Sequence, residues 1–324
     1  PWAQLFILGS LGGLLLEKNR TWVSSPISKW LVLFFIIILV SVFTAYNKYV
    51  AQEALPFFYT WFIIYFLIIN IVTTPTRFLF FLAIFCLASF KISLSLSITW
   101  AKRGFAFTDW GLMGPPGFFQ NSGELAIQMA VFWPLALGVA LGLKQYVSKW
   151  KYYILLLMPV SAGMVILGAS SRGSQLAMLV QLFSKYAAKF FRPRVLISIA
   201  LVGYLLWAFL PDEQKARFED SGSDKTSQQR LYYWEGGYEM MNEYPFTGVG
   251  FFNFPQYFED NYPDKLLYSG AQLPHNILVQ VGADLGYPGL IVYVWMILLS
   301  FILTRRSTRS LKDSSALGPI REIG

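Results

Sequence analysis

The chain has 324 residues, of which 55% are hydrophobic, 18% aromatic and 14% charged. A soluble domain carries about 25% charged residues, so this composition excludes an ordinary soluble protein and predicts a membrane protein. The net charge of +8 does not indicate nucleic-acid binding, because the basic residues stand in short links between apolar runs, where a bilayer places them.

Nine apolar segments are long enough, or nearly so, for helices that cross a bilayer, which takes about 17 to 25 residues. We expect them near residues 2–16, 30–46, 55–72, 77–98, 122–143, 152–170, 173–190, 195–210 and 287–304. The predicted fold class is an all-α polytopic membrane protein with about 9–10 transmembrane helices in this chain and one large, mostly helical outer loop. Because the chain begins at Pro1 rather than methionine, with a short first segment, we expect that its start is missing.

The charges of the links predict the topology. With alternating links, sixteen of the 26 basic residues fall on one side, in short links, which marks that side as cytoplasmic. The long segment 211–274 falls on the other side with eleven acidic residues against five basic ones, although Lys102 and Arg103 on that side run against the trend. We therefore predict transmembrane helices at 1–210, a large outer loop at 211–274, and a C-terminal region at 275–324 with a half-helix, a transmembrane helix and a cytoplasmic tail.

Metal chemistry is not indicated. The single cysteine, Cys86, and the single histidine, His275, cannot form a disulfide, a thiol cluster or a typical zinc site, and the chain has no Asp-x-Asp pattern. Within the long loop, residues 227–244 are predicted to form a helix with Thr226 or Ser227 as its cap. Leu231, Trp234 and Tyr238 fall along one face of that helix.

Arg172 follows Ser170-Ser171 and precedes Gly173, between two apolar segments. An arginine near the membrane costs a few kcal/mol unless it is paired or faces water, so it is a functional candidate. The alternative is an interfacial arginine that extends to lipid headgroups. Gly173, without a side chain, would let backbone or ligand come close.

Arg230 and His275 are the other two candidates. Arg230 is followed by Tyr232, Tyr233 and Trp234, whose rings suit a membrane interface or sugar rings, although a loop arginine can be merely solvated. His275 stands where the loop meets the last apolar segment, and its alternative role is structural. Two guanidiniums suit a diphosphate, and a nearby imidazole can take the proton of a hydroxyl nucleophile.

A succession of short motifs carries a family resemblance. They are Ser-Ser-Arg-Gly at 170–173, Arg-Leu-Tyr-Tyr-Trp at 230–234, Pro-Phe-Thr-Gly-Val-Gly at 245–250, Pro-His-Asn at 274–276 and Leu-Gly-Tyr-Pro-Gly-Leu at 285–290. In this order, around one large outer loop and over about residues 115–305, they resemble the O-antigen ligase and polymerase superfamily of bacterial envelope enzymes.

The resemblance implies an inner-membrane glycosyltransferase that needs neither metal nor other cofactor and whose active site faces the periplasm, so that the outer loop is periplasmic. It would move a glycan from an undecaprenyl-diphosphate carrier to an acceptor hydroxyl on lipid A core, a glycan or a protein. The resemblance assigns the diphosphate to Arg172 and Arg230 and the catalytic base to His275. The implied substrate-binding set is Arg172, Arg230, Trp234, Tyr233, Asn276 and Glu124.

Some points remain open at this level. Residues 121–124, Asn-Ser-Gly-Glu, depart from the Asn-Pro-Asn-like helix start common in the family, so the role of Glu124 is not defined by the resemblance. Members commonly have more spans than the nine expected here, which supports a missing terminus. Ligase, polysaccharide polymerase and protein O-glycosylation enzyme remain alternatives, and the non-enzyme alternatives are an envelope transporter or flippase and a scaffold.

Overall fold

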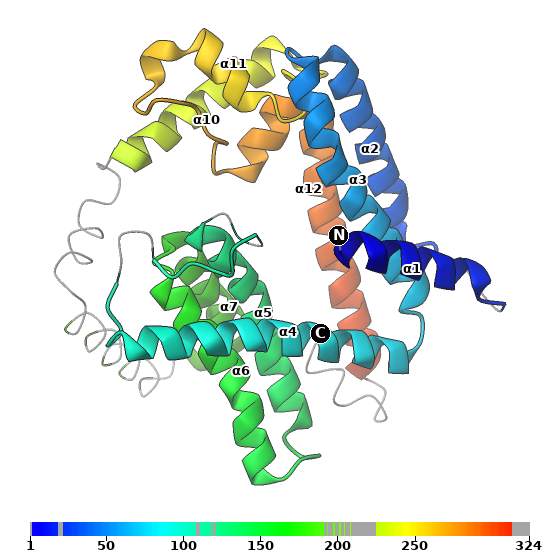
Figure 1. Cartoon of the computed structure of the whole chain (residues 1–324), viewed down its shortest axis with the longest axis vertical. Coiled ribbons are helices and arrows are strands. Elements are labelled where there is room, and N and C mark those ends of the chain that lie inside the picture. The colour runs from blue at the N-terminus through cyan, green and yellow to red at the C-terminus, as the bar shows by residue number, and fades with distance from the viewer. Residues whose placement is uncertain are drawn as a thin grey trace. The chain divides into compact units, whose positions relative to one another are not determined.

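The computed structural model describes residues 2–18, 22–107, 111–117, 119, 121–190 and 225–312, and five single helical positions between 193 and 208. Every regular element in this described part is a helix, which confirms the all-α fold class. The chain divides into two compact units (Figure 1). Unit 1 comprises Pro1–Arg77 and Glu219–Thr304, and unit 2 comprises Phe78–Phe218 and Arg305–Gly324.

Six described helices are long and apolar enough to cross a membrane. They are α2 (Pro26–Thr44), α3 (Lys48–Ile71), α4 (Pro75–Lys102), α5 (Ser122–Leu143), α6 (Lys149–Gly168) and α12 (Ile277–Lys312). The segment expected at 2–16 forms α1 (Trp2–Leu16), which at 15 residues is shorter than a full span. The segment expected at 173–190 forms α7 (Arg172–Phe190), which is not among the six, and the segment at 195–210 lies largely outside the described residues.

In unit 1, α2 and α12 run antiparallel. Near one end the Ser41 hydroxyl donates to the backbone oxygen of Asp284 at 2.8 Å, and near the other end the rings of Trp30 and Trp295 lie 5.9 Å apart. Buried apolar side chains of α2, α3 and α12 form the core between these points. Asn47 begins α3 by accepting the backbone N–H groups of Tyr49 and Val50, which fixes a short α2–α3 link.

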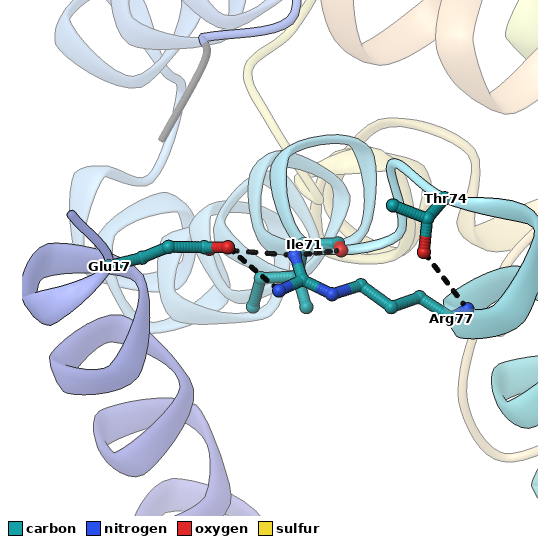
Figure 2. Close-up of polar contacts among 4 residues, drawn as sticks. All are labelled: Glu17, Ile71, Thr74 and Arg77. Carbon is teal, nitrogen blue, oxygen red and sulfur yellow. Dashed lines mark hydrogen bonds and ion pairs between the residues drawn. The ribbon is translucent and has the colours of Figure 1, made fainter. Parts of the chain in front are cut away.

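An ion pair closes the end of unit 1 that bears Lys18 and Lys29. Figure 2 shows Arg77, in the first turn of α4, donating to Glu17 just after α1 at 2.7 Å and to the backbone oxygen of Ile71 at 3.1 Å. The backbone N–H of Arg77 donates to Thr74 at 3.3 Å. One guanidinium therefore holds together the ends of α1 and α3 and the start of α4.

At the opposite end of unit 1, the described part of the long loop is a folded layer with its own core. It contains α10 (Lys225–Glu243), α11 (Phe254–Asn261) and the short η1 (Pro263–Lys265), packed around the buried side chains Tyr233, Met240, Val249, Phe254, Tyr257, Phe258 and Ala283. The predicted helix at 227–244 is confirmed. Its predicted cap is wrong, because the helix includes Lys225 and Thr226, and the Thr226 hydroxyl bonds to that of Tyr268 at 3.0 Å instead.

α12 is broken at Gly286, where φ is 68°. The break is held by the loop, because the N–H of Tyr287 donates to the backbone oxygen of Pro245 at 2.8 Å and the N–H of Val249 donates to that of Ala283 at 2.8 Å. The segment 277–285 is thus a short helix attached to the loop layer. The rest of α12 continues as the apolar span.

Unit 2 contains most of α4 together with α5, α6 and α7. Its core is formed by buried side chains such as Leu125 and Phe132 of α5 and Val165 of α6. Small residues let α4 and α6 approach closely, and Ser161 bonds to Ser93 at 2.8 Å and accepts from Ser97 at 2.9 Å. This packing fixes the end of α6, and with it the turn into α7.

We predict that Gly286→Ala destabilises the fold more than Gly104→Ala does. Both glycines have positive φ, 68° and 66°, so alanine costs about 1–3 kcal/mol of backbone strain at either position. A Cβ at Gly286 would also lie 2.6 Å from the oxygen of Pro245, whereas one at Gly104 would meet nothing within 4 Å. Thermal unfolding of the purified variants in detergent measures the difference, and equal losses would contradict the need for glycine at the break.

Candidate functional site

The candidate site in unit 1 is built on α10. Three of its side chains bond to the backbone of the segment that leads to α12. Gln229 donates to the oxygen of Lys265 at 3.1 Å, Tyr233 accepts the N–H of Gln272 at 2.9 Å, and the indole of Trp234 donates to the oxygen of Pro274 at 2.9 Å. These residues lie on consecutive turns of α10, so the helix fixes the path of the chain up to His275.

Lys265 adds an electrostatic contact to the same face. Its Nζ lies 3.3 Å from Glu239 and 3.4 Å from Glu235 on α10. All three side chains keep substantial exposure, so the net stabilisation is modest. The pairing nevertheless fixes the register of the segment after α11 against α10.

His275 occupies an unusual backbone position directly before α12. Its φ is 52°, in the left-handed region, and Asn276 follows as the cap, accepting the N–H of Leu278 at 3.1 Å. The ring Nε2 lies 3.3 Å from the side-chain oxygen of Gln272. With that oxygen as acceptor, Nε2 carries the proton and Nδ1 is left to accept one.

Burial and the nearby Arg230 both favour the neutral form of this imidazole. Burial lowers the pKa of His275 below its ordinary value of 6.5, and the positive charge of Arg230 lowers it further. The side chain stays exposed on one side, so a substrate can reach a neutral ring. Arg230 is half-buried, and its Nε is buried without a hydrogen-bond partner among the described residues, as expected for a guanidinium that awaits an anion.

Arg172 lies in unit 2, at the first position of α7. The helix follows a strained turn in which Ser170 has a φ of 55°, and the carbonyl of Ser171 accepts the N–H of Gln175 at 3.0 Å. The Ser170 hydroxyl is buried without a partner among the described residues. A cation at a helix N-terminus opposes the helix dipole, whereas an anion is favoured there, so this end of α7 suits a ligand that is negatively charged.

Gly173 has room around it, because a Cβ there would meet nothing within 4 Å in the described chain. Among the described residues, no packing contact therefore requires glycine at this position. Glu124 contacts the N-cap of α5: its N–H donates to the Asn121 side-chain oxygen at 2.9 Å, and its carboxylate accepts from the Asn121 side-chain amide at 3.4 Å.

The structure thus brings Arg230, Trp234, His275 and Asn276 together in unit 1, whereas Arg172 and Glu124 belong to unit 2. Tyr233 is only 2% exposed and packs against Phe258, so it belongs to the buried core of the loop layer. Trp234 and the neighbouring Tyr232 keep exposed rings.

Sequence reasoning missed Asp284. This residue is 3% exposed, and its carboxyl oxygens accept the N–H groups of Phe252 at 3.1 Å and Phe254 at 3.0 Å. The available signal was a carboxylate inside an apolar run, two residues before the Gly-Tyr-Pro-Gly motif that begins at Gly286.

Comparison with known proteins is in keeping with these features. The family model described as O-antigen ligase matches residues 153–294, a shorter stretch than the expected 115–305. No curated protein and no solved structure matches the chain. The matched stretch includes Arg172, Arg230, His275 and Asp284, whereas Glu124 lies outside it. Over this segment, which is less than half of the chain, the protein is similar to the O-antigen ligase family.

Proposed function

We propose that the protein transfers a glycan from an undecaprenyl-diphosphate carrier to an acceptor hydroxyl at the periplasmic face of the bacterial inner membrane. The observation that carries the proposal is that Arg230 of α10 and His275 before α12 lie close enough for the guanidinium, together with burial, to lower the pKa of the imidazole, within the segment that matches the family. A permanent cation beside a proton acceptor is the combination that diphosphate displacement by an alcohol requires.

In the proposed reaction the acceptor oxygen attacks the anomeric carbon of the donor sugar. The bond between that carbon and the diphosphate oxygen breaks, and undecaprenyl diphosphate leaves with the electron pair. His275 takes the proton of the acceptor hydroxyl, while Arg172 and Arg230 stabilise the charge that develops on the diphosphate. The acceptor is lipid A core, a growing polysaccharide or a protein hydroxyl, and these define the ligase, polymerase and protein-glycosylation versions of one reaction.

The periplasmic placement is supported by the charges at the two ends of unit 1. The α2–α3 link lies against the loop layer, because the N–H of Tyr46 donates to Val249 at 2.9 Å and that of Asn47 to Asn253 at 2.6 Å. Lys18, Lys29 and Arg77 lie at the other end of unit 1. By the positive-inside rule, the basic end is cytoplasmic and the loop layer periplasmic.

A transporter or flippase is the alternative from another class. It calls for ionisable groups near the middle of several spans. Purified protein supplied with a lipid-diphosphate glycan and an acceptor separates the two functions, because only the transferase releases undecaprenyl diphosphate.

We expect cysteine labelling to confirm the orientation. In a Cys86→Ala background, Asp264→Cys in the loop layer should react with a membrane-impermeant maleimide in intact spheroplasts, whereas Lys18→Cys should react only after lysis. Both positions are exposed, so accessibility within the protein does not differ between them. If only Lys18→Cys reacted in intact spheroplasts, the proposed orientation would be wrong and the opposite one would hold.

The single histidine allows its protonation to be followed directly by NMR of histidine-labelled protein. We expect a titration midpoint below 6.5, so the imidazole is neutral at pH 7 and transfer declines only as pH falls through that midpoint. Arg230→Gln should raise the midpoint because it removes the repelling charge, yet leave it below 6.5 because the burial remains. An unchanged midpoint in this variant would refute the coupling.

Substitution of the three proposed catalytic residues should abolish transfer in a folded protein. Loss of a general base costs about 10²- to 10⁴-fold, and we expect His275→Ala, Arg172→Ala and Arg230→Ala each to lose at least about 100-fold in the rate of undecaprenyl diphosphate release. Arg230→Lys should recover little, since an ammonium lacks the planar fork of donors. Arg103→Ala, an exposed arginine outside the matched segment, is the control, and full activity of His275→Ala and Arg172→Ala would refute the assignment.

A further inference from the structure

The proposed reaction does not use Asp284, although its carboxyl group is buried between three elements. It lies two positions before Gly286, where α12 is broken, and its backbone oxygen accepts the Ser41 hydroxyl at 2.8 Å and the N–H of Gly250 at 3.1 Å. Its carboxyl oxygens reach a different part of the loop, the N–H groups of Phe252 and Phe254. A single residue thus bonds to α2 and to two points of the loop.

The carboxyl group replaces a missing cap. α11 begins at Phe254, and its N-cap residue, Asn253, makes no side-chain cap bond. The Asn253 side chain is used elsewhere, since it accepts the N–H of Asn47 at 2.6 Å and donates to the oxygen of Phe251 at 3.0 Å. The orphan N–H at the start of α11 is therefore satisfied by Asp284, from a position 30 residues further along the chain.

This bond links the two parts that bear the site. On one side, Asp284 belongs to the short helix 277–285, which begins with the Asn276 cap and directly follows His275. On the other side, the ring of Phe254 packs against Tyr233 at 5.8 Å, one turn after Arg230 on α10. Glycines allow these helices to touch, because a Cβ on Gly237 would overlap Val279 and one on Gly282 would overlap Met241.

We propose that Asp284 is a positioning residue that sets His275 against Arg230 by joining the short helix of α12 to the start of α11. It touches neither reacting group and acts through the two helices that hold them. The inference rests on the proposed function only for its effect on transfer, since the geometry it describes can be measured without any substrate.

The test combines two readouts on the intact protein in detergent. The first is the NMR titration midpoint of His275, and the second is kcat for release of undecaprenyl diphosphate per folded protein. Asp284→Asn keeps the shape of the side chain but turns an amide group toward one of the two N–H donors. We expect it to fold, to move the His275 midpoint back toward 6.5, and to lower kcat by about 10- to 100-fold, as small misplacements of catalytic groups do.

Two control variants separate positioning from general stability. Val292→Ala removes buried volume from the same core of unit 1 without touching the junction, so it should lower the unfolding temperature and leave the midpoint and kcat unchanged. Asp264→Asn changes an exposed carboxylate of the loop and should alter none of these readouts. If Asp284→Asn does not fold, Asp284→Glu, which keeps the acceptor but displaces it by one methylene, should give smaller shifts in the same directions.

The outcomes are distinct. A midpoint that moves in Asp284→Asn while kcat falls supports both positioning and the proposed base. A midpoint that moves while kcat is unchanged supports positioning and overturns the role of His275 in transfer. A midpoint and kcat equal to those of the unchanged protein, in folded Asp284→Asn or Asp284→Glu, overturn the positioning role.

Discussion

The constraint on which the loop side of unit 1 depends is the satisfaction of backbone polar groups at the break in α12. A helix that stops at membrane depth leaves N–H and C=O groups without partners, and lipid cannot supply them. Here the loop segment 245–254 supplies them, through the contacts of Pro245, Val249 and Gly250 with residues 283–287. In turn, the Asp284 carboxyl oxygens accept the backbone N–H groups of Phe252 and Phe254 in the loop. The loop layer and the short helix therefore each supply hydrogen-bond partners that the other would lack.

That mutual requirement gives the site its electrostatic character. His275 and Arg230 stand 45 residues apart in the chain, and a protonated imidazole would be repelled by the guanidinium if their backbones were free to separate. The bonds of Tyr233 and Trp234 to the segment 272–274 prevent this separation. Burial and the positive charge of Arg230 lower the pKa of the imidazole, so in the proposed reaction the cation that would bind the diphosphate also keeps its neighbour able to accept a proton.

The sequence predicted the elements better than their junctions. Apolar length and turn signals were enough to predict the six spans and the loop helix α10, because those properties are local. The cap of α10 was mistaken, since the Thr226 hydroxyl binds the distant Tyr268. Asp284 was missed for the same reason: its partners, Phe252 and Phe254, lie in another motif, and no spacing rule relates them. Arg230 and His275 were found individually, but their proximity needed the fold.

Depth in the bilayer ties the site to its proposed substrate. The short helix 277–285 is attached to the loop layer and the last apolar span continues after Gly286, so His275 stands on the loop side of the membrane boundary. On α10, Leu231, Trp234 and Tyr238 are all exposed, and aromatic side chains with polar tips favour that same boundary. The diphosphate of an isoprenoid carrier lies at this depth, because its chain is anchored in hydrocarbon and its charge must remain hydrated. A donor that diffuses in the leaflet would thus meet Arg230 and His275 without leaving the membrane.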